Sequence, residues 1–321
     1  MSQAIVMTET GGPEVLKLAE GPRPKPGPGE LLIKVAAAGV NFIETYQRSG
    51  AYKVAVPFTP GAEASGTVVE VGEGVQDYAV GARVATAEGR GTYAEFAIVE
   101  AARTLPVPDA VPDEAAAALP LQGMTAHYLI NSSFRVEPGQ TVLTHAGAGG
   151  VGLLLIQLLK LRGARVLTTV STDEKEQLAR SAGADEVLRY DGFAQKVRDL
   201  TDGTGVDVVY DGVGKDTFDG SLASLRIRGM LVLYGAASGP VPPFDLQRLN
   251  PSGSLIVTRP TLVHFLQNPQ ERRWRAQEIF TAAADGKLDV RIGARYPLAD
   301  AAQAHSDLQA RKTTGKVLLV P

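Results

Sequence analysis

Hydrophobic and polar positions follow two different patterns along the chain, and the change comes near residue 124. Up to about residue 120, short apolar runs are separated by clusters of glycine and proline, most densely over residues 21–29. Apolar runs bounded in this way are typical of β-strands. The pattern predicts an all-β first part in the form of a distorted barrel, with strands at 30–36, 65–71 and 83–87.

Beyond residue 124, apolar runs of strand length alternate with segments of helical length. This alternation is typical of a parallel, doubly wound α/β sheet. The final part of the chain reads as two amphipathic helices, 272–284 and 298–310, followed by a strand at 315–320, so the end of the chain is expected to return to the first domain or to cap it. The strands of the sheet are predicted at 141–144, 164–170, 186–188, 206–210, 230–234 and 254–257.

A glycine-rich turn connects the first of these strands to the helix after it. Residues 142–152 read VLTHAGAGGVG, which contains G-x-G-x-x-G. In a βαβ unit the first glycine permits a tight bend, the second lets backbone N–H groups approach a pyrophosphate, and the third allows helix and strand to pack closely. The N-terminus of the helix adds unpaired N–H groups and the positive end of its dipole. The motif predicts a dinucleotide site made by Gly147, Gly149, Gly150, Val151 and Gly152.

The end of the second strand of this unit favours NADP over NAD. NAD sites usually carry Asp or Glu there to hold the ribose 2′-hydroxyl, but here no carboxylate precedes Asp173. Ser171 is placed to hydrogen-bond a 2′-phosphate, although it could instead form a capping box with Glu174. Lys175 lies one turn into the next helix, where a cation opposes the helix dipole unless an anion is nearby. The expected cofactor is therefore NADPH.

Length, charge and composition exclude several classes of protein. A chain of 321 residues is long enough for two domains. Its net charge of −3 argues against nucleic acid or an anionic membrane as the main partner. It has neither an apolar run of membrane-spanning length nor the start of a signal peptide. The absence of cysteine excludes disulfides, thiolate catalysis and cysteine-ligated zinc, and it favours a cytoplasmic location.

Several longer segments point to one family. They include AAGVNFIETYQRSGAY (37–52), PGAEASGTVVEVGEGV (60–75), LQGMTAHYL (121–129) and LIVTRPTL (255–262). With the glycine turn, they make the chain resemble the zinc-free, zeta-crystallin-like NADPH:quinone oxidoreductases of the medium-chain dehydrogenase/reductase superfamily. The resemblance runs from end to end and implies an α/β fold. A GroES-like β-barrel catalytic domain (1–122 and 261–321) would contain an inserted Rossmann NADP-binding domain (123–260), with the active site in the cleft between them.

The resemblance also shows where this chain departs from the zinc-bearing alcohol dehydrogenases of the superfamily. Their zinc ligands align with Asn41, Ala62 and Gln122, and their four-cysteine lobe is missing. Glu63 remains, but one carboxylate cannot make a tetrahedral zinc site. Without a Lewis acid nothing would polarise an alcohol. Reduction of an acceptor that is already electrophilic is therefore expected, because it mainly requires orientation over the nicotinamide.

The resemblance suggests catalytic roles for three residues near the start of the chain. Asn41 and Tyr46 would line the nicotinamide pocket, with barrel packing as the alternative for Tyr46. Tyr52 aligns with a tyrosine used by related enoyl reductases and could donate a proton or a hydrogen bond to the acceptor oxygen. The alternative for Tyr52 is a solvent-facing loop residue. Gln122 and Thr125 are expected to open the helix leading into the Rossmann domain, with Thr125 either contacting the nicotinamide or capping that helix.

Further candidates are spread over the rest of the chain. Tyr190 would lie beside the adenosine phosphate or pack on the surface, and Gly235 would leave room for the cofactor or form a plain turn. Lys316 and Arg259 would face the cleft or be solvated surface charges, and Lys316 is expected to contact the cofactor. Of the four histidines, those at positions 127, 145 and 305 are expected to be structural. His264 is a candidate for contact with the substrate.

Three functions compete at this point. The first is an NADPH-dependent quinone oxidoreductase that passes hydride or single electrons to small quinones. The second is an NADPH-dependent reductase of α,β-unsaturated carbonyls or enoyl thioesters. The third is a non-catalytic, crystallin-like or RNA-associated NADPH-binding protein, against which the intact cofactor features and the acidic balance count. The resemblance implies a homodimer paired through the Rossmann edge strands, here 254–257 with 230–234 beside it.

Overall fold

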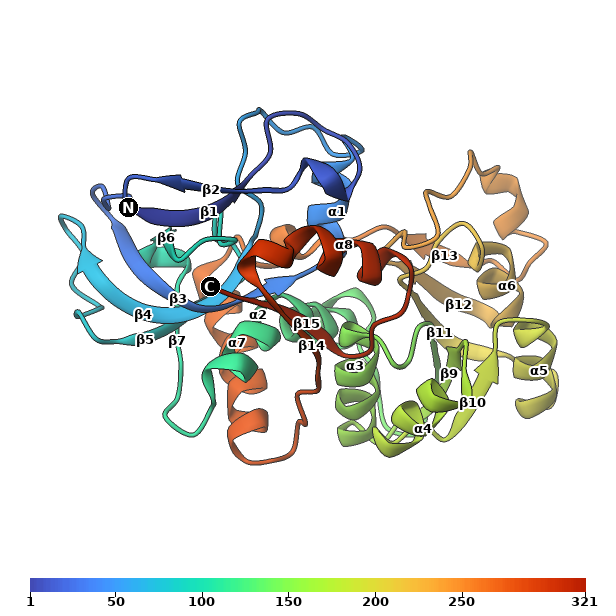
Figure 1. The fold of residues 1–321 in the computed structure, drawn as a ribbon. Helices are drawn as coiled ribbons and strands as arrows, with labels where there is room; N and C mark the ends of the chain where they lie inside the picture. The colour runs from blue at the N-terminus through green and yellow to red at the C-terminus, as the bar shows by residue number, and fades with distance from the viewer. The chain divides into compact units, whose positions relative to one another are not determined.

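The computed structural model describes residues 1–321 and divides them into two compact units (Figure 1). The first unit, called the catalytic unit after the role expected from the sequence, combines Met1–Met124 with Leu266–Pro321, and the second, called the Rossmann unit, is Thr125–Phe265. The catalytic unit is thus built from both ends of the chain, with the Rossmann unit inserted. The boundaries proposed from sequence, after residues 122 and 260, lie slightly earlier than these.

A seven-stranded sheet forms the frame of the catalytic unit. Its strands lie in the order β14-β15-β3-β4-β5-β7, and β6 pairs with β3. The last strand, β15, is antiparallel to β3, so the end of the chain returns to the sheet begun near its start, as predicted. A separate hairpin of β1 (Ser2–Val6) and β2 (Lys17–Gly21) completes the unit. The sheet strands are β3 (Glu30–Val40), β4 (Glu63–Val71), β5 (Arg83–Thr86), β6 (Phe96–Glu100), β7 (Leu105–Pro106), β14 (Ile292–Pro297) and β15 (Lys316–Val320).

Apolar residues of the sheet strands form the core of the catalytic unit. Inward-facing residues of the strands, such as Leu31, Ile33 and Val35 of β3, join one hydrophobic cluster with residues from the end of the chain, including Val317 and Leu319. Residues two apart along a strand point to the same face. The helices α7 (Pro269–Ala284) and α8 (Ala301–Gln309) are those predicted near the C-terminus.

The expectation that the first 120 residues are all-β is wrong in two places. The helix α1 (Phe42–Arg48) follows β3, and α2 (Asp113–Tyr128) follows β7. The short α1 begins at Asn41 with a capping box to Glu44, a local signal that outweighs the strand-like surroundings. Gln122 and Thr125 therefore lie in the second half of α2 and do not open a helix, so the capping role considered for Thr125 is also wrong. A π-helical turn (Leu129–Ser133) continues α2.

A six-stranded parallel sheet forms the Rossmann unit. The order β10-β9-β8-β11-β12-β13 reverses direction between β8 and β11. In open α/β sheets, ligands bind beyond the carboxyl ends of the strands at such a switch point. The strands are β8 (Thr141–Thr144), β9 (Arg165–Val170), β10 (Glu186–Arg189), β11 (Val206–Asp211), β12 (Leu225–Leu233) and β13 (Ile256–Thr258), confirming the parallel sheet predicted from sequence.

Four helices connect these strands: α3 (Gly150–Leu161), α4 (Asp173–Ser181), α5 (Phe193–Leu200) and α6 (Phe218–Ser224). Short 3-10 turns lie at Pro13–Val15, Ala101–Arg103, Leu246–Leu249, Leu262–Phe265 and Leu298–Asp300. None of the helices combines the length and the apolar character needed to span a bilayer.

Candidate functional site

The glycine turn after β8 is shaped by close backbone approach. The N–H of Gly147 donates to the carbonyl of Thr169, 3.0 Å away at the end of β9. A Cβ on Gly147 would lie 2.3 Å from the Thr168 hydroxyl, and one on Gly152 would lie 2.2 Å from the Ala146 carbonyl. Both contacts are too short for any side chain. These two glycines are therefore required by the turn itself, as the motif predicts.

The N-terminus of α3 is open to an anion. Gly149 is the N-cap residue and offers no side chain to the first turn, which also contains no acidic residue. The first N–H groups of a helix have no partner within the helix, and the dipole places positive charge at this end. With a helix of twelve residues behind it, the turn has the features of a pyrophosphate site.

At the carboxyl end of β9, Ser171 and Lys175 lie together. The Lys175 ammonium donates to the Ser171 hydroxyl at 3.5 Å. The N-cap of α4 is Thr172, whose hydroxyl accepts from the Lys175 N–H at 3.3 Å. The capping box considered for Ser171 and Glu174 is therefore wrong, because the neighbouring threonine does the capping. This leaves the Ser171 hydroxyl outside the cap and beside a cation.

Arg189 offsets the acidic residues of this region. It ends β10 and pairs with Asp173 and with Glu176, the second at 3.0 Å. Both carboxylates belong to the first turn of α4, close in sequence to Lys175. Tyr190 follows directly, and its ring lies 6.2 Å from that of His145, tilted by 23°. Asp173 and Glu176 on α4 are thus both paired with the Arg189 guanidinium.

In the catalytic unit, a buried polar cluster forms around Asn41. Its amide nitrogen donates to Glu63 at 2.9 Å, and its amide oxygen accepts from Lys316 at 2.8 Å and from Gln122 at 3.3 Å. Lys316 also pairs with Glu63. The Lys316 side chain is 1% exposed and that of Glu63 is 0% exposed, so the surface-charge alternative for Lys316 is wrong.

This cluster brings together positions far apart in the sequence. The structure places Asn41 before α1, Glu63 at the start of β4, Gln122 in α2 and Lys316 at the start of β15. The Leu121 N–H adds a 2.8 Å hydrogen bond to the second Glu63 oxygen. The side-chain oxygen of Asn41 accepts twice, and its NH₂ group also reaches the Gly39 carbonyl at 3.4 Å. Its hydrogen-bonding capacity is therefore filled by the protein.

Glu44 is a member of this region that the sequence reading missed. Its carboxylate accepts from the N–H groups of Asn41 at 2.8 Å and Ala62 at 3.3 Å. Burial raises its pKa to about 7, with Lys316 opposing the rise. The N-x-x-E spacing from Asn41 to Glu44 is a recognisable capping-box signal and would have identified it.

Two tyrosines of the catalytic unit lie side by side. Tyr46 is on α1, Tyr52 follows that helix, and their ring centroids are 5.4 Å apart. The Tyr52 N–H donates to the Tyr46 carbonyl at 2.9 Å. Tyr52 is 47% exposed, so the residue is open to solvent.

The far end of α1 is held by a second buried group. Arg48 donates to the Gly11 carbonyl at 3.2 Å and to Gln309 at 2.8 Å, and it contacts His305 Nδ1 at 3.4 Å. The Tyr93 hydroxyl lies 3.1 Å from His305 Nε2. Burial, with the nearby Arg48 charge, lowers the pKa of His305 to about 3, so the ring is neutral. This anchoring agrees with the structural role expected for His305.

The remaining candidate residues belong neither to the Asn41 cluster nor to the tyrosine pair. A Cβ on Gly235 would lie 2.5 Å from the Gly212 carbonyl, so contact with protein backbone already requires a glycine there. Arg259 donates to the Pro260 carbonyl at 3.1 Å. Thr125 and His127 are buried on α2, and His264 lies in a 3-10 turn.

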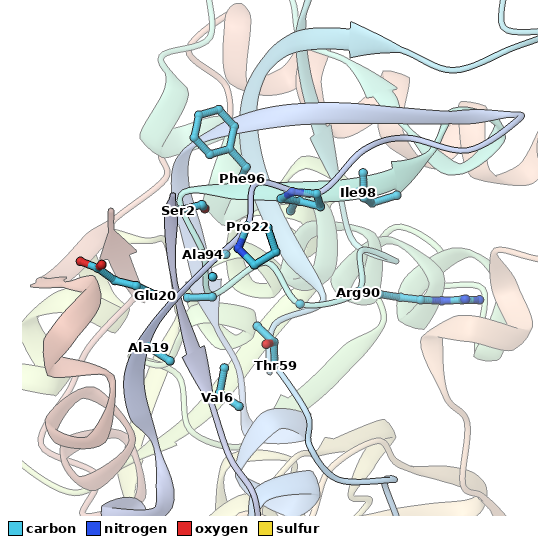
Figure 2. Close-up of a pocket in the computed structure, with 15 residues that line it drawn as sticks. Ser2, Val6, Ala19, Glu20, Pro22, Thr59, Arg90, Ala94, Phe96 and Ile98 are labelled. Atoms are coloured by element: carbon cyan, nitrogen blue, oxygen red, sulfur yellow. The ribbon is translucent and has the colours of Figure 1, made fainter.

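A cavity of about 310 Å³ opens elsewhere in the catalytic unit (Figure 2). Its walls come from β1, β2 and β6, together with Thr59 and Arg90. None of the candidate residues named above lines it. The cavity is therefore separate from the Asn41 cluster and from the two tyrosines.

Comparison with known proteins gives matches over the whole chain. Residues 27–109 match the alcohol dehydrogenase GroES-like domain, and residues 150–279 match the zinc-binding dehydrogenase family. A quinone oxidoreductase from Pseudomonas aeruginosa is 42% identical over 325 residues, with 100% of both chains covered. A 2-haloacrylate reductase from a Burkholderia species is 40% identical and covers 100% of this chain and 99% of its own. A solved mycobacterial structure, described as complexed with NADPH, is 55% identical, covers 100% of both chains and has a TM-score of 0.97.

The GroES-like and Rossmann parts, each matched by a family model, define a medium-chain dehydrogenase/reductase. Within that superfamily the chain belongs to the quinone oxidoreductase family. The resemblance and the fold class inferred from the sequence are confirmed, and the protein is an oxidoreductase.

Proposed function

We propose that this protein is an NADPH-dependent quinone oxidoreductase that works without a metal. The observation that carries the proposal is the buried cluster of Asn41, Glu63 and Lys316 in the catalytic unit. Of the three positions that align with zinc ligands, two carry the amides of Asn41 and Gln122 and the third carries Ala62, while the neighbouring Glu63 is paired with Lys316. The acceptor must then be electrophilic by itself, as a quinone is. Relatives named quinone oxidoreductase, 39–42% identical over the full chain, support the choice of acceptor.

The residues present fit NADPH. The uncapped start of α3 would hold the pyrophosphate through the N–H groups of its first turn. Ser171 and Lys175 would hold the 2′-phosphate, and no carboxylate stands at the end of β9 to favour NAD. Tyr190 would lie at the adenosine side. Thr125, Gly235 and Lys316 complete the cofactor contacts proposed from sequence. The solved mycobacterial relative described as complexed with NADPH supports this choice.

The chemistry requires little beyond orientation. Bound NADPH supplies a hydride to the acceptor. Asn41, whose hydrogen bonds are filled by the protein, would act by fixing the start of α1 and thereby Tyr46. The hydroxyl of Tyr52, a residue that is 47% exposed, would donate a hydrogen bond or a proton to the acceptor oxygen. The hydride and one proton together convert a quinone carbonyl and its conjugated system to a hydroquinone.

The residues present do not fit a zinc ion, despite the description of the family model. A catalytic zinc site needs three protein ligands from His, Cys, Asp or Glu. No group of three or more such residues is positioned to hold a metal, and Glu63 is already paired with an ammonium. Activity should therefore survive exhaustive chelation. A stoichiometric metal whose removal abolishes turnover would contradict this part of the proposal.

A direct comparison of acceptors tests the proposal. NADPH oxidation should be measured side by side with a small quinone, an enone and an enoyl thioester, and the quinone is expected to give the highest kcat/KM. The second candidate is reduction of α,β-unsaturated carbonyls, favoured by the relative named 2-haloacrylate reductase. A higher kcat/KM for the enone would replace the first function by the second.

The proposal includes a homodimer formed through the Rossmann edge. One of the two edge strands of the sheet is β13, with β12 beside it. Ile256 on β13 is 49% exposed and Ile227 on β12 is 72% exposed. An unpaired apolar edge strand favours association with another copy. Light scattering at micromolar concentration should give twice the chain mass, and a monomer would refute the dimer.

A further inference from the structure

A chain of four buried polar side chains crosses the carboxyl edge of the Rossmann sheet. Thr169 contacts His145 at 2.8 Å, His145 contacts Ser221 at 2.9 Å, and Ser221 donates to Asp211 at 2.8 Å. All four residues are 0% exposed. No nucleophile here is open to a substrate, so the arrangement is not a hydrolytic triad even though it contains serine, histidine and aspartate.

The hydrogen bonds can be oriented in only one way. The Ser221 hydroxyl donates its proton to Asp211, so its oxygen accepts from His145 Nε2. Burial lowers the pKa of His145, which keeps the ring neutral with a single N–H, at Nε2. Its Nδ1 therefore accepts from the Thr169 hydroxyl. The four groups form a directed chain that runs from Thr169 on β9, through His145 directly after β8 and Ser221 on α6, to Asp211 on β11.

Each end of this chain is bound to backbone that faces the switch point of the sheet. The Thr169 carbonyl accepts from the N–H of Gly147 in the glycine turn, at 3.0 Å. The Asp211 carboxylate accepts from the N–H groups of Val213 and Gly214, at 2.8 and 2.9 Å. The chain thus connects the turn after β8 to the loop after β11, the two strands between which the sheet order reverses.

We propose that Thr169, His145 and Ser221 are positioning residues for the dinucleotide, which hold the glycine turn and the 211–217 loop in their binding geometry before the cofactor arrives. The inference rests on the proposed function, because it assumes that NADPH binds at this edge. When a site is already ordered before its ligand arrives, less of the binding free energy is lost in ordering it. Breaking this chain of hydrogen bonds therefore weakens NADPH binding even where the folded, cofactor-free protein stays stable.

Isosteric substitutions break the chain at two points. Thr169→Val removes the hydroxyl that donates to His145 and keeps a β-branched side chain, while Thr169→Ser keeps the hydroxyl. Ser221→Ala removes the central hydroxyl. Thr144→Val is the matched control, because Thr144 immediately precedes His145, is equally buried, and its hydroxyl has no hydrogen-bond partner. All four variants are made in the full chain.

Fluorescence titration with NADPH gives the dissociation constant of each variant. Thermal unfolding without cofactor gives its stability, and steady-state kinetics give KM and kcat. Thr169→Val and Ser221→Ala should weaken NADPH binding about tenfold, as expected for loss of one buried hydrogen bond. The change should fall more on KM for NADPH than on kcat. Thr169→Ser should bind close to the natural protein, and Thr144→Val should not change the dissociation constant.

Unchanged NADPH affinity in Thr169→Val, accompanied by a lower unfolding temperature, would overturn the inference and leave the chain a purely structural feature. The inference also fails if Thr144→Val weakens binding as much as Thr169→Val. If Ser221→Ala does not fold, Thr169→Val and Thr169→Ser decide the matter between them. Failure of the natural protein to bind NADPH would instead overturn the proposed function, so the two failures are distinguishable.

Discussion

Each unit of the protein buries a carboxylate, and the two are satisfied in different ways. Glu63 of the catalytic unit is paired with the ammonium of Lys316 and receives neutral hydrogen bonds from Asn41 and the Leu121 N–H. Asp211 of the Rossmann unit has no cationic partner among its hydrogen bonds. It accepts from two backbone N–H groups and from the hydroxyls of Thr217 and Ser221.

The difference shows two ways to keep a charge inside a protein. A buried charge is costly unless it is paired or fully hydrogen-bonded. Glu63 depends on one cation, so the loss of that cation leaves a nearly uncompensated charge. Asp211 depends on four smaller contributions, two of them from backbone N–H groups, which substitutions other than proline leave in place. Loss of one partner is therefore expected to affect the catalytic unit more severely than the Rossmann unit.

The largest expected effect is that of Lys316→Met, which replaces the ammonium by an apolar side chain of similar length. Removing one partner of a buried ion pair typically lowers the free energy of unfolding by about 3–5 kcal/mol. Chemical unfolding followed by circular dichroism measures this loss. Ser221→Ala, which removes one of four donors to Asp211, should cost less, about 1–3 kcal/mol.

The double variant Lys316→Met/Glu63→Gln makes the comparison sharper. It removes both charges together, so part of the loss should be recovered relative to Lys316→Met alone. A double variant that is less stable than Lys316→Met would show that the ion pair is not the source of the effect. A larger loss for Ser221→Ala than for Lys316→Met would reverse the comparison between the two units.

Glu44 should make the free energy of unfolding of the catalytic unit depend on pH. Its pKa is raised from 4.5 to about 7 by burial, so the folded protein binds the proton more tightly than the unfolded chain. The stability that this provides is complete below pH 4.5 and is lost as the pH rises toward about 7, by roughly 3 kcal/mol. Glu44→Gln should remove this fall, measured as the free energy of unfolding against pH.

The variant must be compared with the natural protein, because His305 has the opposite effect. Its pKa is lowered to about 3, so the stability linked to the neutral ring is lost as the pH falls from about 6.5 toward 3. Both proteins contain His305, so its contribution cancels in the difference between them. Parallel stability curves between pH 4.5 and 7 would show that Glu44 does not titrate as described.

The sequence predicts the fold correctly where the pattern of apolar residues and the length of each segment indicate the same element. The six Rossmann strands and the glycine turn follow from alternation of apolar runs and helices and from local turn chemistry. The helices α1 and α2 could not be predicted in this way. With seven residues, α1 is too short for a periodic pattern. The apolar residues of α2 form no clear stripe, and Pro120 lies inside it, so its helical form is set by packing.

The candidate site was partly predictable, for a different physical reason. Ser171 lies one residue before the N-cap of α4 and Lys175 lies in its first turn, so their proximity follows from local geometry. The contacts of Lys316 with Asn41 and of His145 with Ser221 join distant parts of the chain. Their formation depends on strand order and register, which sequence spacing does not determine.

Lys175 gives a prediction of intermediate size on the exposed side of the Rossmann unit. Lys175→Ala should weaken NADPH binding about tenfold or more, because a charge-assisted hydrogen bond contributes about 1.5–3 kcal/mol. NADH binding should change little. Arg180→Ala removes the same charge one turn further along α4, where Arg180 pairs with Glu176, and is the matched control. Equal losses for NADPH and NADH, or for the two variants, would argue against a 2′-phosphate contact.

The smallest expected effect is on the chemistry itself. Tyr52→Phe removes the hydroxyl of the exposed member of the tyrosine pair and leaves its ring in place. If the acceptor is a quinone, solvent can protonate the product, and kcat should stay within about tenfold, below the 10²–10⁴ typical of a required general acid. With an enone, the carbon or oxygen of the developing enolate needs a positioned proton, and the loss should reach about 10² or more. The ratio of the two losses, measured in one preparation, therefore separates an enzyme adapted to quinones from one adapted to conjugated carbonyls. A loss of 10² with the quinone would make Tyr52 a required acid and would show that orientation alone does not account for the rate.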